Sequence, residues 1–372
     1  MGDGISRSYL ILYVTIVTIG LLLTAGIVYY AGPGHLQSDH YEEGIADILL
    51  SGNNVGNPGD YNAGIVQKYY VSKLRDKKEV VVIGSSRSMQ LRNSLFPGRS
   101  FFNNSGPWAH LGDLFAIYGL YEEKGLMPSV VILGLDPWML DKSQVELGWK
   151  CLEPQYHTMA QRLGIESSVG NAGTVGTMSS TIRELLSWPN FENALFNLLL
   201  NVSYFPTEGR PDVPLLLSDG SISFRSEPSN IVEANARSWA KNPESRNGLT
   251  GFAHSTELDQ ERIKSLEAFV DYLHGENVEV IFWLAPYHPA AYDILRHSGQ
   301  NLMLLKAESC FRDIAKDKDV PVVGSYDPQQ SNSTRDDFYD AVHPKESSIE
   351  KAFSKLKCTE SLQCSVAESP NP

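Results

Sequence analysis

Two short segments far apart in the chain carry hydroxyl, imidazole and carboxyl groups in an order that suits nucleophilic catalysis. Gly84-Ser85-Ser86-Arg87 follows a run of β-branched residues. A serine just past a strand can present its hydroxyl above the sheet while the next helix offers backbone N–H donors. In Asp340-Ala-Val-His343, the carboxylate can accept from one ring nitrogen and leave the other to take a serine proton. We therefore predict Ser86 as nucleophile, His343 as general base and Asp340 as the group that orients the histidine.

Each segment also has a simpler explanation. Serines at the start of a helix usually cap it, and the acidic residues around Asp340 also suit a solvated turn. Catalysis is favoured because both segments lie on strand-end loops of one predicted sheet, a combination that chance seldom produces.

Other residues on the same predicted sheet edge are candidate substrate ligands. His288 follows a predicted strand over residues 278–284, and it either binds substrate, serves as an alternative base, or fixes its Pro-rich loop by hydrogen bonds. Trp108 and Trp138 follow predicted strand-end loops and can stack on sugar rings, although aromatic residues there more often pack within the loop. His110 is predicted to be structural.

The elements expected to position these residues alternate between strand and helix. One helical pattern covers residues 263–273, with Ser255 or Thr256 as N-cap candidates and Gly275 as the end. The alternation predicts an α/β fold with a mainly parallel sheet covered on both sides, and ligands at the carboxyl ends of its strands. The β-branched run 79–83 is the first predicted strand, and the further strand candidates are 100–104, 129–135, 278–284 and 320–324.

Three regions fall outside this alternation. Residues 35–78 form a helical lead-in before the sheet. From about 140 to 254 the chain carries a helical stretch over 182–200 and a hairpin over 215–224. We interpret this region as an insertion over the sheet edge, and residues 358–372 as a loose tail.

An uncharged apolar segment near the N-terminus predicts one transmembrane helix within residues 1–34. No charged residue occurs from Ser8 to Gly34, a length that crosses a bilayer core of about 30 Å as a helix. A cleaved signal peptide is the main alternative, but its apolar region normally covers only about 7–15 residues. Arg7 precedes the span and acidic residues follow it, so we expect the short N-terminus in the cytoplasm and the remainder of the chain outside the cytoplasm.

Charge and cysteine usage exclude several classes of protein. The 372 residues carry a formal net charge of −13, which argues against a nucleic-acid partner. The four cysteines are widely spaced without a C-x-x-C pair, so we expect no metal site and no cofactor. Cys310 is predicted to be a buried thiol, and Cys358 and Cys364 can form a small disulfide if the chain is exported.

Four blocks, in order along roughly residues 79–357, resemble those of the SGNH/GDSL hydrolase superfamily. They are Gly84-Ser85-Ser86, Gly106 after Asn103-Asn104-Ser105, Gly134-Leu135-Asp136, and Asp340-Ala-Val-His343. The chain is most similar to the membrane-anchored, extracytoplasmic branch of the superfamily. This branch includes the D-alanine transfer protein of lipoteichoic acid synthesis and exopolysaccharide O-acetyltransferases.

The resemblance implies a three-layer α/β/α, flavodoxin-like domain over residues 79–357 and an oxyanion hole that includes the backbone N–H groups of Ser86 and Gly106. Asp136 stands where the superfamily has Asn, and an ionised carboxylate accepts hydrogen bonds but donates none. Either Asp136 is turned away, paired with Arg87, or the site is weak or inactive. Arg87 is a further candidate substrate ligand.

Two hypotheses about function follow from the resemblance. The first is a serine acyl esterase or O-acyltransferase that acts on an acylated envelope polymer or exported glycan through an acyl-Ser86 intermediate. A membrane-bound O-acyltransferase is a partner that would favour transfer. The second is a catalytically silent protein of the same fold that binds glycan or supports an envelope assembly complex.

Overall fold

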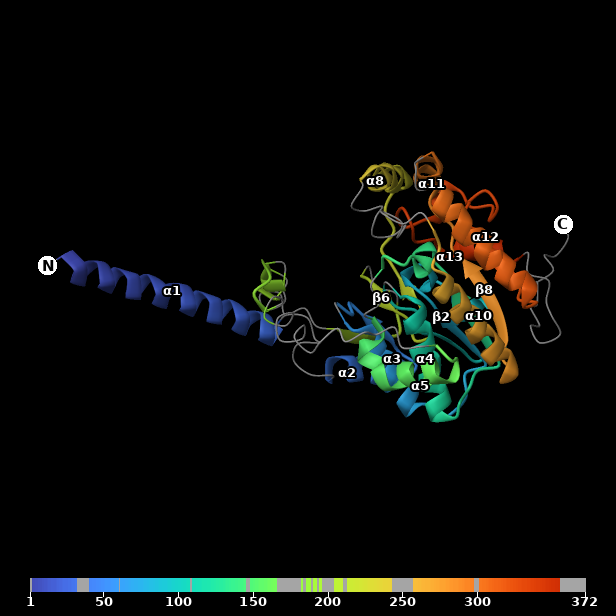
Figure 1. The fold of residues 1–372 in the computed structure, drawn as a ribbon, viewed down its shortest axis with the longest axis horizontal. Coiled ribbons are helices and arrows are strands. Elements are labelled where there is room, and N and C mark those ends of the chain that lie inside the picture. The colour runs from blue at the N-terminus through green and yellow to red at the C-terminus, as the bar shows by residue number, and fades with distance from the viewer. Residues whose placement is uncertain are drawn as a thin grey trace.

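A five-stranded parallel sheet and an N-terminal apolar helix define a mixed α/β architecture (Figure 1). The computed structural model describes residues 2–31, 40–59, 61–107, 109–144, 148–165, 182, 185–188, 190–192, 194–195, 204–209, 213–242, 257–297 and 301–354. Outside the described residues lie Trp108, Cys358, Cys364 and, from the predicted helical stretch over 182–200, residues 183–184, 189, 193 and 196–200.

All five predicted strands of the main sheet are confirmed. The spatial order is β3-β2-β4-β8-β9, and every neighbouring pair is parallel. If the five strands are numbered by their place in the chain, their order across the sheet is 2-1-3-4-5. In this order the direction of winding reverses between the first and third strands, which are β2 and β4. The bounds are β2 Val80–Ile83, β3 Phe101–Asn103, β4 Val130–Gly134, β8 Glu279–Leu284 and β9 Val322–Gly324.

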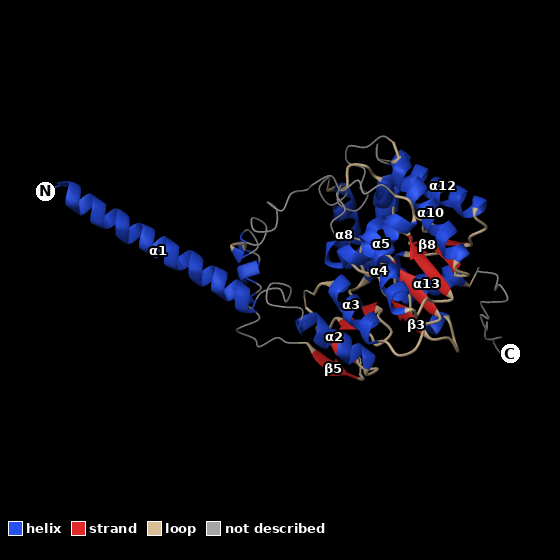
Figure 2. Ribbon diagram, turned by 60° about the horizontal axis from the view of Figure 1, so that its bottom comes forward, coloured by secondary structure: helices blue, strands red, loops and turns tan. Residues whose placement is uncertain are grey.

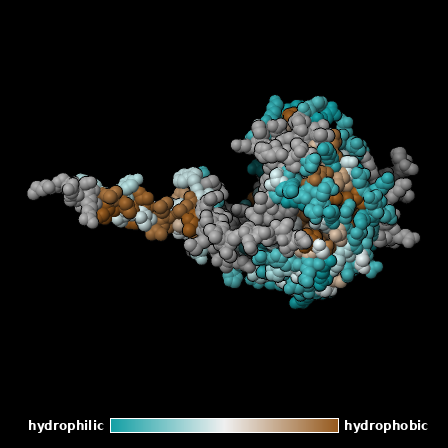
Figure 3. Space-filling model, viewed as in Figure 1, coloured by the Kyte–Doolittle hydropathy of each residue, from teal (hydrophilic) through white to brown (hydrophobic). Residues whose placement is uncertain are grey.

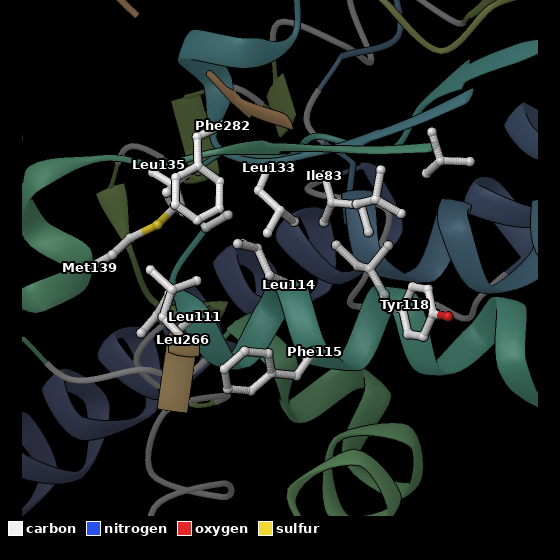
Figure 4. Packing of buried hydrophobic residues seen from close by; sticks show 14 of the residues in the cluster. Ile83, Leu111, Leu114, Phe115, Tyr118, Leu133, Leu135, Met139, Leu266 and Phe282 are labelled. Atoms are coloured by element: carbon white, nitrogen blue, oxygen red, sulfur yellow. The ribbon is translucent and has the colours of Figure 1, made fainter. Parts of the chain in front are cut away.

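Successive residues of the strands enter hydrophobic clusters on opposite faces of the sheet, as the two-residue period of a strand requires. Val81 and Leu133 belong to the larger cluster, and Val80 and Ile132 to the smaller one. Figure 4 shows Leu114 of α4 facing the larger cluster beside Leu133. The helices of the larger cluster include α4 Leu111–Lys124, α10 Gln260–Gly275 and α12 Asn301–Asp317, whereas α13 Glu346–Phe353 joins the smaller one.

A second, antiparallel sheet joins the lead-in to the region after residue 204. β1 (Asn54–Gly56) pairs with β5 (Phe205–Thr207) on one side and with β6 (Leu215–Leu216) on the other. β6 then pairs with β7 (Ile222–Ser223), which confirms the predicted hairpin. Gly220 has φ +79° in its turn, a conformation that glycine adopts at little cost.

The remaining helices surround these sheets (Figure 2). The lead-in contains α2 His40–Leu50 and α3 Ala63–Lys73. Further along are α5 Glu153–Arg162, α8 Ser229–Lys241 and α11 Pro289–Arg296. The expected N-cap of α10, Ser255 or Thr256, is wrong: Asp259 caps this helix by accepting from Glu261 N–H at 3.0 Å, as a short carboxylate at that position can.

The N-terminal helix α1 (Gly2–Ala31) extends away from the sheets, and its apolar side chains form the brown surface in Figure 3. Residues Tyr9–Tyr29 have a mean hydropathy of 2.4 and are almost entirely exposed. This helix is long and apolar enough to span a membrane.

Cys310 is half-buried on α12, and burial raises the pKa of its thiol to about 11. The thiol is therefore in its neutral form near neutral pH and is a poor nucleophile. This agrees with a structural role, although the side chain is less buried than the sequence predicts.

Candidate active site

The candidate site lies at the carboxyl ends of β2 and β4, where the winding of the sheet reverses and ligands of open α/β sheets bind. Ser86 opens the 3-10 turn η2 (Ser86–Ser88) directly after β2. Asp136 precedes η4 (Pro137–Leu140) after β4. The loop that carries Asp340 and His343 follows η6 (Arg335–Asp337) and reaches the same edge.

Ser86, His343 and Asp340 form a continuous hydrogen-bonded chain. The Nε2 atom of His343 lies 3.0 Å from Ser86 Oγ, and its Nδ1 lies 2.7 Å from Asp340 Oδ2. Ser86 and His343 are both half-buried, so this pair of residues is partly open to solvent. With the proton on Nδ1, Nε2 can accept the serine proton, which is the geometry of an activated serine nucleophile.

The loop around Asp340 fixes this carboxylate in place. Its Oδ1 accepts the backbone N–H groups of Val342 and His343 at 2.8 and 2.9 Å. Burial raises the pKa of Asp340, but the bonds from His343 and from these N–H groups outweigh it, so the net pKa is lowered. The carboxylate is therefore ionised near neutral pH and can stabilise an imidazolium.

The turn that presents Ser86 requires close backbone packing. The Ser85 hydroxyl caps η2 by accepting from Arg87 N–H at 3.1 Å. A Cβ atom on Gly84 would lie 2.9 Å from the Cα of Gly134. Glycine therefore suits the first position of both sequence blocks, the one that begins at Gly84 and the one that begins at Gly134. No described residue accepts the N–H of Ser86, which leaves it available to a developing oxyanion.

Asp136 is turned away from Ser86 and pairs with Arg87. The guanidinium Nη1 donates to Asp136 Oδ1 at 2.7 Å, and the Ser85 hydroxyl donates to Oδ2 at 2.5 Å. Both members of the ion pair are at most 2 % exposed. Burial raises the pKa of Asp136 above its ordinary value, and Arg87 and Ser85, which favour the carboxylate form, offset this shift only in part. The pairing of Asp136 with Arg87 that the sequence suggested is therefore observed.

Several expected site residues have other roles. The N–H of Gly106 donates to Gly84 O at 3.0 Å, so it is not free to bind an oxyanion. Trp138 is buried, and its indole Nε1–H donates to Ala109 O at 3.1 Å, which prevents it from stacking on a sugar. Arg87 is completely buried and therefore does not contact substrate in this conformation.

His288 is also buried, and it supports the loops instead of facing the site. Its Nδ1 accepts from Ala290 N–H at 3.1 Å and caps α11, while its backbone N–H donates to Ala341 O at 2.9 Å. Burial lowers the pKa of the imidazole. His110, predicted to be structural, is buried at the start of α4, and burial lowers its pKa to about 4.

The sequence does not predict the aromatic wall that lies beside His343. The half-buried ring of Phe224, just past β7, lies 5.3 Å from the His343 ring, and Tyr339 meets Phe224 edge-on at 5.5 Å. The predicted hairpin ends at Phe224, but its sequence gives no sign that it reaches residue 343. This wall limits the directions from which a substrate can approach His343.

Within the described part of the chain, no group of three or more His, Cys, Asp or Glu side chains is arranged to hold a metal ion. Comparison of the chain with protein-family models and with curated proteins gives no match.

Proposed function

We propose that this protein is a membrane-anchored serine acyl esterase or O-acyltransferase that acts outside the cytoplasm on an acylated envelope polymer or exported glycan. The observation that carries the proposal is the chain of contacts from Ser86 through His343 to Asp340. The contact between Ser86 and His343 joins residues 257 positions apart in the chain.

In the proposed reaction, Ser86 Oγ attacks the carbonyl carbon of the ester while its proton passes to His343 Nε2. The Ser86 N–H stabilises the tetrahedral oxyanion. Collapse of the tetrahedral intermediate breaks the bond to the leaving alcohol, and His343 gives this alcohol the proton it took from Ser86. An acyl-Ser86 ester remains. Water or a sugar hydroxyl then attacks this ester with His343 again as base, which gives hydrolysis or transfer.

We further propose the three-layer SGNH arrangement for residues 79–357, with the region from about 140 to 254 as an insertion. Clusters on both faces of the sheet support the layers, and the contact of Phe224 with His343 supports an insertion that borders the site. For the anchor, Arg7 near the start of α1, just before its apolar span, supports a cytoplasmic N-terminus.

A catalytically silent glycan-binding protein is the second candidate. It is favoured by the oxyanion site, because Gly106 N–H is already bonded to Gly84 O and Asp136 offers no donor. Loss of one such donor typically lowers a rate by about 10²–10³-fold.

A fluorophosphonate probe separates the two candidates. We expect the full-length protein in detergent to be labelled at Ser86, and Ser86→Ala to remain unlabelled. Ser88→Ala is the matched control, since Ser88 lies in the same turn and its hydroxyl has no partner among the described residues. Absence of labelling from pH 6 to 9 in a folded protein would favour the silent binder. If labelling occurs, acetylated and deacetylated glycans can then be compared as substrates.

A further inference from the structure

Arg87 contacts three loops at the carboxyl edge of the main sheet. Its Nη1 donates to Asp136 after β4, and its Nη2 donates to the carbonyl of Ala285 after β8. Its Nε donates to the carbonyl of Val342 at 3.3 Å, in the loop between Asp340 and His343. Because Arg87 directly follows Ser86, one side chain connects the nucleophile turn to the loop of its base.

The surroundings of Arg87 fix the plane of its guanidinium. The ring of Tyr287 lies 4.0 Å from the guanidinium carbon, and Tyr326 lies 5.6 Å away. Tyr326 is itself held by a bond of 2.9 Å from its hydroxyl to Leu135 O. A planar, forked donor fits between these rings and three acceptors, whereas the ammonium of a lysine presents a single point charge.

Asp136 provides the charge that this buried cation needs. An unpaired guanidinium in a fully buried position is strongly unfavourable. The carboxylate compensates it with Oδ1 and accepts from Ser85 with Oδ2, and Ser85 in turn caps the Ser86 turn. This explains why a carboxylate occupies the position where the sequence resemblance leads one to expect an amide.

We propose that Arg87 is a positioning residue that sets the distance between Ser86 and His343 through the Val342 carbonyl, and that Asp136 orients its guanidinium. The effect on the reaction rests on the function proposed above. The bond from Arg87 to the Val342 carbonyl is a tether between the Ser86 turn and the His343 loop. This tether does not depend on the proposed function, because it is a structural property that can be measured without turnover.

The test compares Arg87→Lys with Arg92→Lys in the full-length protein. Arg92 is a matched control because it is also buried, on the same segment, but it pairs with Glu346 at 2.5 Å and not with the His343 loop. We expect Arg87→Lys to lower kcat, or the maximal rate of fluorophosphonate labelling, by about 10²-fold. KM should remain within about twofold, because Arg87 does not face substrate. Arg92→Lys should change the rate by less than about threefold.

Amide hydrogen exchange gives the second readout. The peptide that covers residues 339–344 should exchange about tenfold faster in Arg87→Lys than in the wild type, and should be unchanged in Arg92→Lys. If the wild type is never labelled but this exchange difference is present, the proposed function fails and the tether stands. The proposal would be overturned if a folded Arg87→Lys were labelled as fast as the wild type and its peptide over residues 339–344 exchanged amide hydrogen at the wild-type rate.

Asp136→Asn provides a second variant if Arg87→Lys does not fold. The amide retains an acceptor for Arg87 but removes the compensating charge, so we expect labelling to fall by about tenfold and the same peptide to exchange faster. A rise in activity would mean that the amide acts as an oxyanion donor, and it would overturn the orienting role of Asp136.

Discussion

Replacing Asp340 by asparagine should change the protonation of His343 while it preserves the shape of the loop. Oδ1 of Asp340 holds the two backbone N–H groups of Val342 and His343, and the carbonyl oxygen of asparagine can keep both. Its NH₂ group then faces His343 Nδ1. Because an amide NH₂ only donates, Nδ1 must become the acceptor and the ring proton moves to Nε2. In this tautomer Nε2 cannot accept the proton of Ser86.

The expected loss follows from this wrong tautomer. In a serine hydrolase the equivalent change lowers kcat by about 10⁴-fold, or roughly 5 kcal/mol in activation free energy. The Asp340 side chain is 49 % exposed, so water competes for the imidazole. We therefore expect a smaller loss for Asp340→Asn, on the order of 10³-fold.

The assay is the initial rate of hydrolysis of an activated acetyl ester by the full-length protein. Asp336→Asn is the matched control, because Asp336 is an exposed carboxylate near the same loop that lies 3.8 Å from Arg335 instead of beside His343. Its rate should stay within about twofold of wild type. A loss of less than tenfold in correctly folded Asp340→Asn, or an equal loss in the control, would refute the reasoning about the tautomer.

Three further predictions concern the triad, acid stability and the core. Ser86→Ala and His343→Ala should each abolish nearly all ester hydrolysis, measured as initial rates. The double variant should be scarcely slower than either single variant, whereas additive losses would mean that the two residues act separately. Burial raises the pKa of Asp337, but bonds from Lys351 and neighbouring groups lower it to about 2. Its carboxylate should therefore contribute about 2 kcal/mol above pH 4, lost as the pH falls from 4 to 2. Urea unfolding of Asp337→Asn should show a deficit at pH 6 that vanishes near pH 2. Leu114→Ala should lower the free energy of unfolding by about 2–5 kcal/mol in the same assay, because Leu114 is fully buried; a loss below 1 kcal/mol would contradict the packing in Figure 4.

The main sheet was predictable because its strands carry a local signal. Strands buried on both faces read as continuous β-branched runs, and Val80–Ile83 and Val130–Gly134 have this pattern. β1 has no such signal: its three residues lie in a Gly/Asn-rich loop and pair with residues about 150 positions later. Pairing at that separation is decided by tertiary packing, which propensity does not contain.

The candidate site likewise has features that the sequence predicts and features that only tertiary packing decides. The spacing of Asp340 and His343 and the position of Ser86 after a strand predict the contacts that the structure shows. The hydrogen bond that occupies Gly106 N–H depends on where the Gly84 carbonyl points. Likewise, Trp138 follows a strand-end aspartate but finds its partner in Ala109, on another loop. Residue type indicates that such groups can bind substrate, and only the packing decides whether they are already engaged.

The short connection between α1 and the rest of the chain limits how far the site can move from a bilayer. α1 ends at Ala31 and α2 begins at His40. α2 is fixed to the α/β body because Ile45, Ala46 and Leu49 are buried in its larger cluster. A fully extended chain between these helices reaches at most roughly 30 Å. With α1 across a membrane, the body therefore samples only a thin layer next to the lipid, where it meets membrane-proximal chains far more often than polymers released into the medium.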